Sequence, residues 1–178
     1  MKHVHMRHSF LLFWICASLI SSSCAQEYKH NFRVRTGDPA PDFEIVETDG
    51  DRYFLSSLEG HVVLLKFTAS WCGVCRREMP HIEEKIWQPG RDKGLKVIAI
   101  DRGEPLTKVK EYQAGLDISY PMALDPDGEV FARYAEPQSG VTRNVVIDKE
   151  GKIICLTRLF RMDEFNEMKR IIFEELEK

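Results

Sequence analysis

The sequence lacks the features that mark nucleic-acid-binding and disordered chains. Its 178 residues carry a formal net charge of -3 and contain no long basic run, so nucleic acid is not expected as a partner. From Gly37 onward there is no internal repeat and no low-complexity tract. Because 43% of the residues are hydrophobic, the chain is expected to form one globular domain around an ordinary core.

The chain also lacks an apolar run long enough to span a bilayer. The stretch SFLLFWICASLI, residues 9–20, falls short of the roughly 20 residues needed, so a signal peptide is favoured over a retained membrane helix. Lys2 and Arg7 precede this stretch and the small residues of SSSCA follow it, which is the pattern of an export signal over residues 1–25. The mature protein is therefore expected in the periplasm or cell envelope.

Two ways of processing this N-terminal segment remain open. Residues 23–25, SCA, offer small side chains to an ordinary signal peptidase, whereas residues 20–24 resemble a loose bacterial lipobox. In the second case Cys24 would be lipidated, and a diacylglycerol anchor would attach the domain to a membrane. Residues 26–36 would then form a polar tether, and residues 37–178 would form the folded domain.

Strand and helix signals alternate along the rest of the chain. The pair Asp49-Gly50 suits the turn of a two-residue hairpin, and HVVLLKFT at 61–68 is typical of a central strand covered on both faces. Pro80 is expected to kink the following helix without ending it. Further strands are expected over 95–101, 119–125, 144–148 and 152–160, and helices over 77–88, 104–115, 128–135 and 163–178. This order predicts an α/β sandwich with a central mixed sheet and an N-terminal β-hairpin.

Cys72 and Cys75, in KFTASWCGVCRREMP, follow the predicted central strand. Zinc would need two further ligands, but the other cysteines lie in the export segment or, as Cys155, inside a strand, so no metal site is expected. Covalent haem requires a histidine directly after the second cysteine, where Arg76 stands. An inert disulfide staple remains an alternative, although such a short loop constrains the unfolded chain little.

The position of the pair favours redox chemistry. If the helix begins at Cys72, unpaired backbone N–H groups and the helix dipole stabilise its thiolate. Cys75 lies one turn later on the same helix face, so a disulfide can close with little backbone movement. Arg76 and Arg77 add positive charge that also favours a thiolate. No cofactor is expected beyond the redox-active Cys72–Cys75 disulfide.

WCGVC after an apolar strand resembles a thioredoxin active site. GDPAPDFEIVETDG, the block LSSLEGHVVLLKFTASWCGVCRREMP and VVIDKEGKI resemble, more specifically, the exported TlpA/ResA-like thiol-disulfide oxidoreductases, which are AhpC/TSA-related. The resemblance extends over residues 35–178 and implies a thioredoxin-like three-layer sandwich. It also implies a monomeric reductase of client proteins with disulfides. Because an exported compartment is oxidising, a membrane electron donor is implied as well.

The resemblance implies roles for individual residues. Cys72 would be the attacking thiolate, Cys75 would resolve the mixed disulfide, and Glu78 would adjust thiol acidity or move a proton. For Glu78 the alternative is an ordinary position on the helix surface. The substrate surface is expected to contain Trp71, Gly73, Val74, Thr142 and Arg143.

Thr142 is a departure from the family pattern. Thioredoxin-like proteins usually carry a cis-proline six residues before the aspartate that ends this strand, and counting back from Asp148 gives Thr142. A cis bond before a non-proline residue costs several kcal/mol, so we expect the Val141–Thr142 bond to be trans or strained. The substrate loop would then differ from that of the family, with Arg143 and Asn144 helping to form it.

Two other functions remain open. A peroxiredoxin would use Cys72 as its peroxidatic cysteine, with threonine three residues earlier and proline seven earlier, but Ala69 and Leu65 occupy those positions. An exported binding domain that kept the fold and lost turnover is supported by Thr142 in place of the usual proline. Peroxide consumption would identify the first, and slow alkylation of Cys72 after mild reduction would identify the second.

Overall fold

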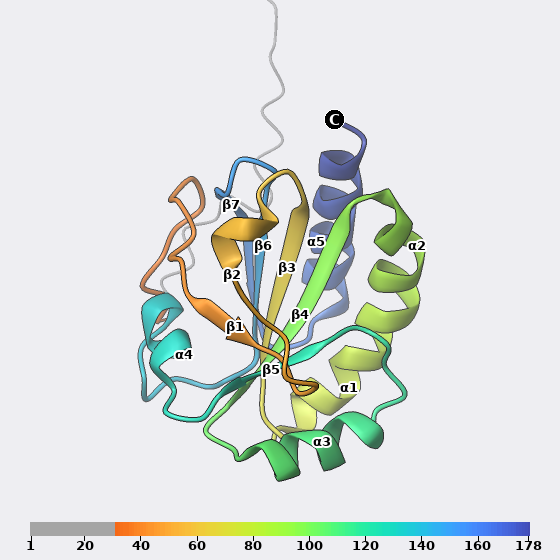
Figure 1. Cartoon of the computed structure of the whole chain (residues 1–178). Coiled ribbons are helices and arrows are strands. Elements are labelled where there is room, and N and C mark those ends of the chain that lie inside the picture. Colours follow the sequence, from red (N-terminus) through yellow and green to blue (C-terminus); the bar gives the residue numbers. More distant parts are fainter. Residues whose placement is uncertain (1–30) are drawn as a thin grey trace, which may run out of the picture.

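The computed structural model describes residues 31–178, which form a central sheet with helices on both faces (Figure 1). The strands are β1 (Glu44–Val46), β2 (Arg52–Phe54), β3 (Val62–Thr68), β4 (Leu95–Arg102), β5 (Met122–Asp125), β6 (Arg143–Ile147) and β7 (Ile153–Arg158). The helices are α1 (Gly73–Ile82), α2 (Gln88–Gly90), α3 (Leu106–Ala114), α4 (Glu129–Tyr134) and α5 (Met162–Leu176). Within these residues no helix combines the length and apolar character needed to cross a bilayer. The predicted export signal and Cys24 lie outside the described residues.

The five-stranded sheet has the order β5-β4-β3-β6-β7. β3, β4 and β5 are parallel, whereas β6 runs antiparallel to both β3 and β7, so the predicted mixed sheet is confirmed. Phe67 pairs with Arg143, which pairs with Arg158, and Thr68 pairs with Asp101. The carboxyl ends of β3, β4 and β7 therefore meet at one edge of the sheet, the lower edge in Figure 1, where α1 and α3 begin.

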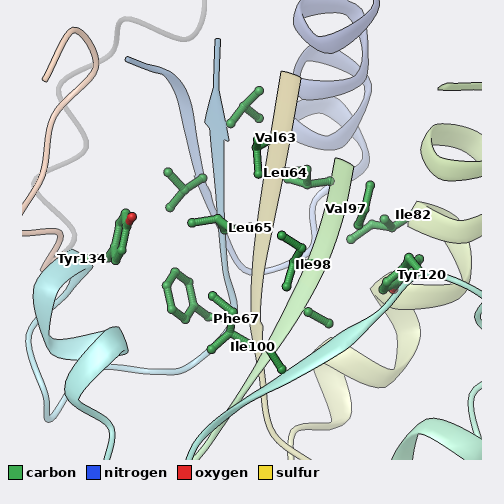
Figure 2. Close-up of a cluster of buried hydrophobic side chains, with 14 of the residues drawn as sticks. Val63, Leu64, Leu65, Phe67, Ile82, Val97, Ile98, Ile100, Tyr120 and Tyr134 are labelled. Carbon is green, nitrogen blue, oxygen red and sulfur yellow. The ribbon is translucent and has the colours of Figure 1, made fainter. Parts of the chain in front are cut away.

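The core lies on both faces of β3, whose seven residues are all buried. On one face Phe67 packs edge-on against Phe131 of α4, with ring centroids 5.5 Å apart. On the other face lies α1, which buries Met79 and Ile82. Figure 2 shows Phe67 on one side of the sheet and Ile82 on the other. Each large apolar side chain buried in this way contributes about 1.5–3 kcal/mol, so β3 is a firm base for the segment that carries the cysteines.

Two local predictions are also confirmed. β1 and β2 form an antiparallel hairpin, and Gly50 in its turn has φ 109°, a conformation that glycine adopts without strain. Pro80 lies inside α1 and does not end it, since the helix continues through a wider turn, Glu83–Trp87, into α2. The short 3-10 turns Leu55–Leu58 and Arg91–Lys93 were not predicted.

The polar tether predicted over residues 26–36 extends too far toward the domain. Phe32 forms a β-bridge with Ala135, and the backbone N–H of Arg33 donates to the carbonyl of Tyr134. Val34 is buried in the core. The segment packs in this way because it supplies apolar side chains and backbone donors to the end of α4. Residues 32–34 therefore belong to the folded domain.

Candidate active site

Cys72 and Cys75 form a disulfide at the start of α1, with their Cα atoms 5.3 Å apart. Cys72 is the residue that caps the helix, as predicted, and its Sγ accepts a hydrogen bond from the backbone N–H of Cys75 at 3.2 Å. Cys75 is fully buried, whereas 7% of Cys72 is exposed, so Cys72 is the sulfur that a partner can reach. Residues 31–178 contain no group of three or more His, Cys, Asp or Glu placed to hold a metal ion.

Thr142 lies directly opposite the two sulfurs. Its Oγ1 is 3.1 Å from Sγ of Cys72 and 3.3 Å from Sγ of Cys75. No cis peptide bond occurs in residues 31–178, so the Val141–Thr142 bond is trans. The carbonyl of Thr142 accepts a hydrogen bond at 3.3 Å from the N–H of Leu159, which has φ 64°, an uncommon value for leucine. The loop before β6 is thus held to the loop after β7, and the Thr142 hydroxyl faces the cysteine pair.

Arg143 points away from the two cysteines. Side chains alternate along a strand, so Thr142 and Asn144 face α1 and Arg143 faces the opposite side of the sheet. There its guanidinium lies 4.4 Å from the centre of the Phe32 ring and is almost fully buried. Burial lowers the pKa of Arg143 to about 10, and the charge of Arg158 acts in the same direction. The side chain of Arg143 therefore does not reach the substrate surface that we predicted for it.

Glu78 is buried, so the surface alternative for this residue is wrong. It forms an ion pair with Lys66 of β3, and both side chains are almost completely inaccessible. The Nδ2 of Asn144 donates to Oε1 of Glu78 at 2.7 Å and to Oγ1 of Thr157 at 2.8 Å. Burial lowers the pKa of Lys66, and the charge of Glu78 opposes that shift. Asn144 therefore lies within β6 and binds Glu78, instead of helping to form a substrate loop.

Comparison with known proteins identifies the family. The model of the AhpC/TSA family matches residues 36–155, which include both cysteines and Thr142. The chain belongs to the AhpC/TSA family. Within it, the thiol-disulfide oxidoreductase ResA of Bacillus cereus (strain ATCC 10987 / NRS 248) is 30% identical over 155 residues, which cover 84% of this chain and 88% of that protein. ResA of Bacillus subtilis (strain 168) is 28% identical, covering 86% and 83%. The chain is accordingly a thiol-disulfide oxidoreductase.

Similar solved structures support the same assignment. A candidate protein disulfide isomerase from Bacteroides thetaiotaomicron is 50% identical, with a TM-score of 0.81 and coverage of 83% of this chain and 94% of that one. A candidate thiol:disulfide interchange protein DsbE from Chlorobium tepidum is 28% identical, with a TM-score of 0.72 and coverage of 80% and 99%. The thioredoxin-like fold predicted from the sequence is confirmed.

The segment between β3 and the cysteines is fixed from two sides. The carboxylate of Glu104 accepts hydrogen bonds from the backbone N–H and, at 2.6 Å, the hydroxyl of Ser70. The Nε of Arg76 donates to the carbonyl of Ser70 at 2.8 Å, and its guanidinium lies 4.7 Å from the centre of the Tyr112 ring. These contacts hold the backbone that leads into Cys72. No local sequence signal pointed to Glu104, because it lies 34 residues from Ser70.

Exposed apolar side chains surround the active-site edge of this AhpC/TSA-family domain. Trp71, which precedes Cys72, is 69% exposed, Gly73 is also exposed, and Val74 is half-buried. Other exposed large apolar residues follow strands that end at this edge, and they were not predicted from the sequence. They are Leu106, after β4, and Leu159 and Met162, after β7. The sheet edge that carries the cysteines therefore also carries several exposed apolar side chains.

Proposed function

We propose that the Cys72–Cys75 dithiol reduces disulfide bonds in client proteins of the cell envelope. The observation that carries this proposal is the setting of Cys72 at the N-cap of α1. The Cys75 N–H at 3.2 Å and the Thr142 hydroxyl at 3.1 Å are both placed to stabilise a thiolate on Cys72. No cofactor takes part, because the two electrons reside on the cysteine pair.

The exchange proceeds in two balanced steps. The Cys72 thiolate attacks one sulfur of a client disulfide, forming a mixed disulfide and releasing the other client sulfur as a thiolate. The Cys75 thiol then loses its proton and attacks Sγ of Cys72. This forms the Cys72–Cys75 disulfide and releases the second client sulfur. Two electrons have passed from the protein to the client, and the buried position of Cys75 suits a thiol that reacts only within its own chain.

Export belongs to this proposal and rests on the pattern of residues 1–25. In an oxidising compartment the disulfide must be reduced again, so a membrane donor supplies two electrons for each turnover. Lipidation of Cys24 would keep the domain beside such a donor. Mass spectrometry of the mature N-terminus tests the anchor, because an unmodified chain that begins at Gln26 rules it out. The potential of the cysteine pair against glutathione tests the direction of electron flow.

Trapping of clients tests the roles of the two cysteines. Cys75→Ser should accumulate mixed disulfides with envelope proteins through Cys72, and these should disappear on reduction. Cys72→Ser is the matched control and should accumulate none. Non-reducing gels followed by mass spectrometry of the trapped bands provide the measurement. Equal trapping by the two variants would contradict the assignment of the attacking and resolving thiols.

The two alternative functions gain no specific support from the structure. The positions three and seven residues before Cys72, where a peroxiredoxin would have threonine and proline, hold Ala69 and Leu65. The structural likeness to peroxidoxin BcpB of Mycobacterium tuberculosis, at 22% identity and a TM-score of 0.64, shows a shared fold alone. For a binding module that lost turnover, the support was the missing proline. The position of Thr142 instead supplies a hydroxyl to both sulfurs.

A further inference from the structure

Lys66 is a charged side chain in the most deeply buried strand of the protein. It lies in β3 between Leu65 and Phe67, and none of its surface is exposed. Lysine is almost never fully buried unless it is paired, because its ammonium group loses its hydration. In the described residues its partner is Glu78, twelve positions later on α1. The ion pair with Glu78 offsets part of the lost hydration of the Lys66 ammonium group. The surroundings of Glu78 indicate what this pair does in the protein.

Glu78 is fixed from two neighbouring strands at once. Lys66 of β3 donates to Oε2, and Asn144 of β6 donates to Oε1 at 2.7 Å. Hydrogen bonds from donors to both oxygens favour the charged form of a carboxyl, because adding a proton would displace one of them. Of these two donors only Lys66 brings a positive charge. Removing that charge would leave a carboxylate with one neutral partner at a site that excludes water.

This network adjoins the reactive sulfurs. Glu78 follows Cys75 by three residues, so the two side chains are neighbours on the same face of α1. Asn144 of β6 lies two residues after Thr142, which directly precedes the strand, and both side chains face the α1 side. The charge of Glu78 also reaches Tyr120, whose pKa is raised well above its usual value, chiefly by burial. Screening by solvent is weak here, so a net charge on Glu78 would act strongly on thiolate formation.

We propose that Lys66 is a positioning residue for thiol-disulfide exchange, which holds Glu78 in place and cancels its charge beside the cysteines. This inference rests on the proposed function, because it assigns Lys66 to the same reaction. With Lys66 present, the Cys72 thiolate forms next to a neutral ion pair. Without Lys66, the thiolate would form next to a second anion, and the two acids would titrate together. Lys66 thus acts on the thiols through Glu78 and does not itself react.

Thiolate absorbance measured against pH tests this proposal in protein that carries Cys75→Ser, so that only the active-site thiol of Cys72 reports. In Lys66→Met the thiolate of Cys72 should be about tenfold less populated at neutral pH than in the parent. In a Glu78→Gln background the same substitution should have little effect, because an unpaired buried amine loses its charge. Lys96→Met, which removes a lysine from β4 at the other end of the sheet, is the matched control and should not move the titration.

Two results would overturn the proposal. If Lys66→Met folds and Cys72 titrates as in the parent, Lys66 is only structural. If the shift is equal with and without Glu78, Lys66 acts through its own charge.

A measurement on the unsubstituted protein covers the case in which Lys66→Met does not fold. The Nζ of Lys66, observed by NMR, should have the chemical shift of a charged ammonium group at neutral pH, because its ion pair with Glu78 requires that charge. A neutral amine at this pH would contradict the proposal directly. Insulin reduction by the parent protein is a separate assay. Its failure would remove the proposed function while leaving the charge measurement unaffected.

Discussion

Glu78 and Asp101 are two buried carboxyl groups near the same edge of the sheet, and their surroundings differ in one respect. Each oxygen of Glu78 accepts a hydrogen bond, one from Lys66 and one from Asn144. Asp101, near the end of β4, is fully buried, and no N–H or hydroxyl group within residues 31–178 donates to either of its oxygens. The group that it interacts with is another carboxyl, that of Glu104. The two buried carboxyl groups therefore differ in their partners: Glu78 has two donors, and Asp101 has a second acid.

The difference matters for Asp101, because burial without a donor disfavours the charged form of a carboxyl. Burial, with the negative charge of Glu104 as the next cause, raises the pKa of Asp101 from 3.8 to about 7. Glu78 is held by an ammonium group and an amide instead. The active-site edge thus combines a carboxyl whose charge is compensated with one that changes its charge near neutral pH.

The same chemical change at the two sites should have opposite effects on stability, and the larger effect is expected at Glu78. Glu78→Gln breaks a buried ion pair and leaves Lys66 without its counter-charge, so the free energy of unfolding should fall by about 3 kcal/mol. Urea denaturation at neutral pH provides the measurement. A loss below about 1 kcal/mol would show that the ion pair contributes little to stability. Glu78 and Asp101 would then not differ in the way described here.

Asp101→Asn should instead stabilise the protein, by about 2 kcal/mol at pH 8 and by almost nothing at pH 4. Between about pH 4 and pH 7 the folded protein keeps the Asp101 proton that the unfolded chain has lost. The parent therefore loses stability as the pH rises from about 4 to about 7, and the variant should lack this slope. Denaturation at several pH values tests it, with Asp92→Asn, at an exposed aspartate, as the matched control. Equal slopes in parent and variant would mean that Asp101 is already charged at low pH.

Glu104→Gln should have the smallest effect on stability. It separates the two main causes of the raised Asp101 pKa, which are burial and the charge of Glu104. It removes the negative charge beside Asp101, so the pKa of Asp101 should fall toward its ordinary range. The resulting gain in stability at high pH is offset by weaker hydrogen bonds to Ser70, and the net change should stay below about 1 kcal/mol. The midpoint of the stability-versus-pH curve is the measurement. An unchanged midpoint would show that burial alone raises the pKa of Asp101.

Local sequence signals predicted the elements well. The order of strands and helices, the start of α1 at Cys72 and the hairpin turn at Gly50 depend on residues within a few positions of one another, and the structure has all three. The long-range partners were not predictable in this way. Glu78 binds Lys66 across 12 residues and Asn144 across 66, and a helix pattern does not show which strand residue a glutamate will face.

Arg143 shows an error that strand geometry could have prevented. We placed Thr142 and Arg143 together on the substrate surface, yet adjacent residues of a strand point to opposite faces. Once Thr142 faces the cysteines, Arg143 must face α4, and the structure has it there. Lys66 carried a comparable signal, since a lysine inside a continuous apolar strand requires a buried partner.

The contact of Phe32 with Arg143 ties the N-terminal segment to the strand that supports the reactive centre. The aromatic ring covers the guanidinium on one face of β6, while Thr142, the residue before, touches both sulfurs from the other. Because none of the Arg143 side chain is needed on the cysteine side, the Phe32 ring shields this buried charge from water on the face of β6 away from the active site. Phe32 and Thr142 thus flank β6 from opposite faces, one beside a buried cation and the other beside the two sulfurs.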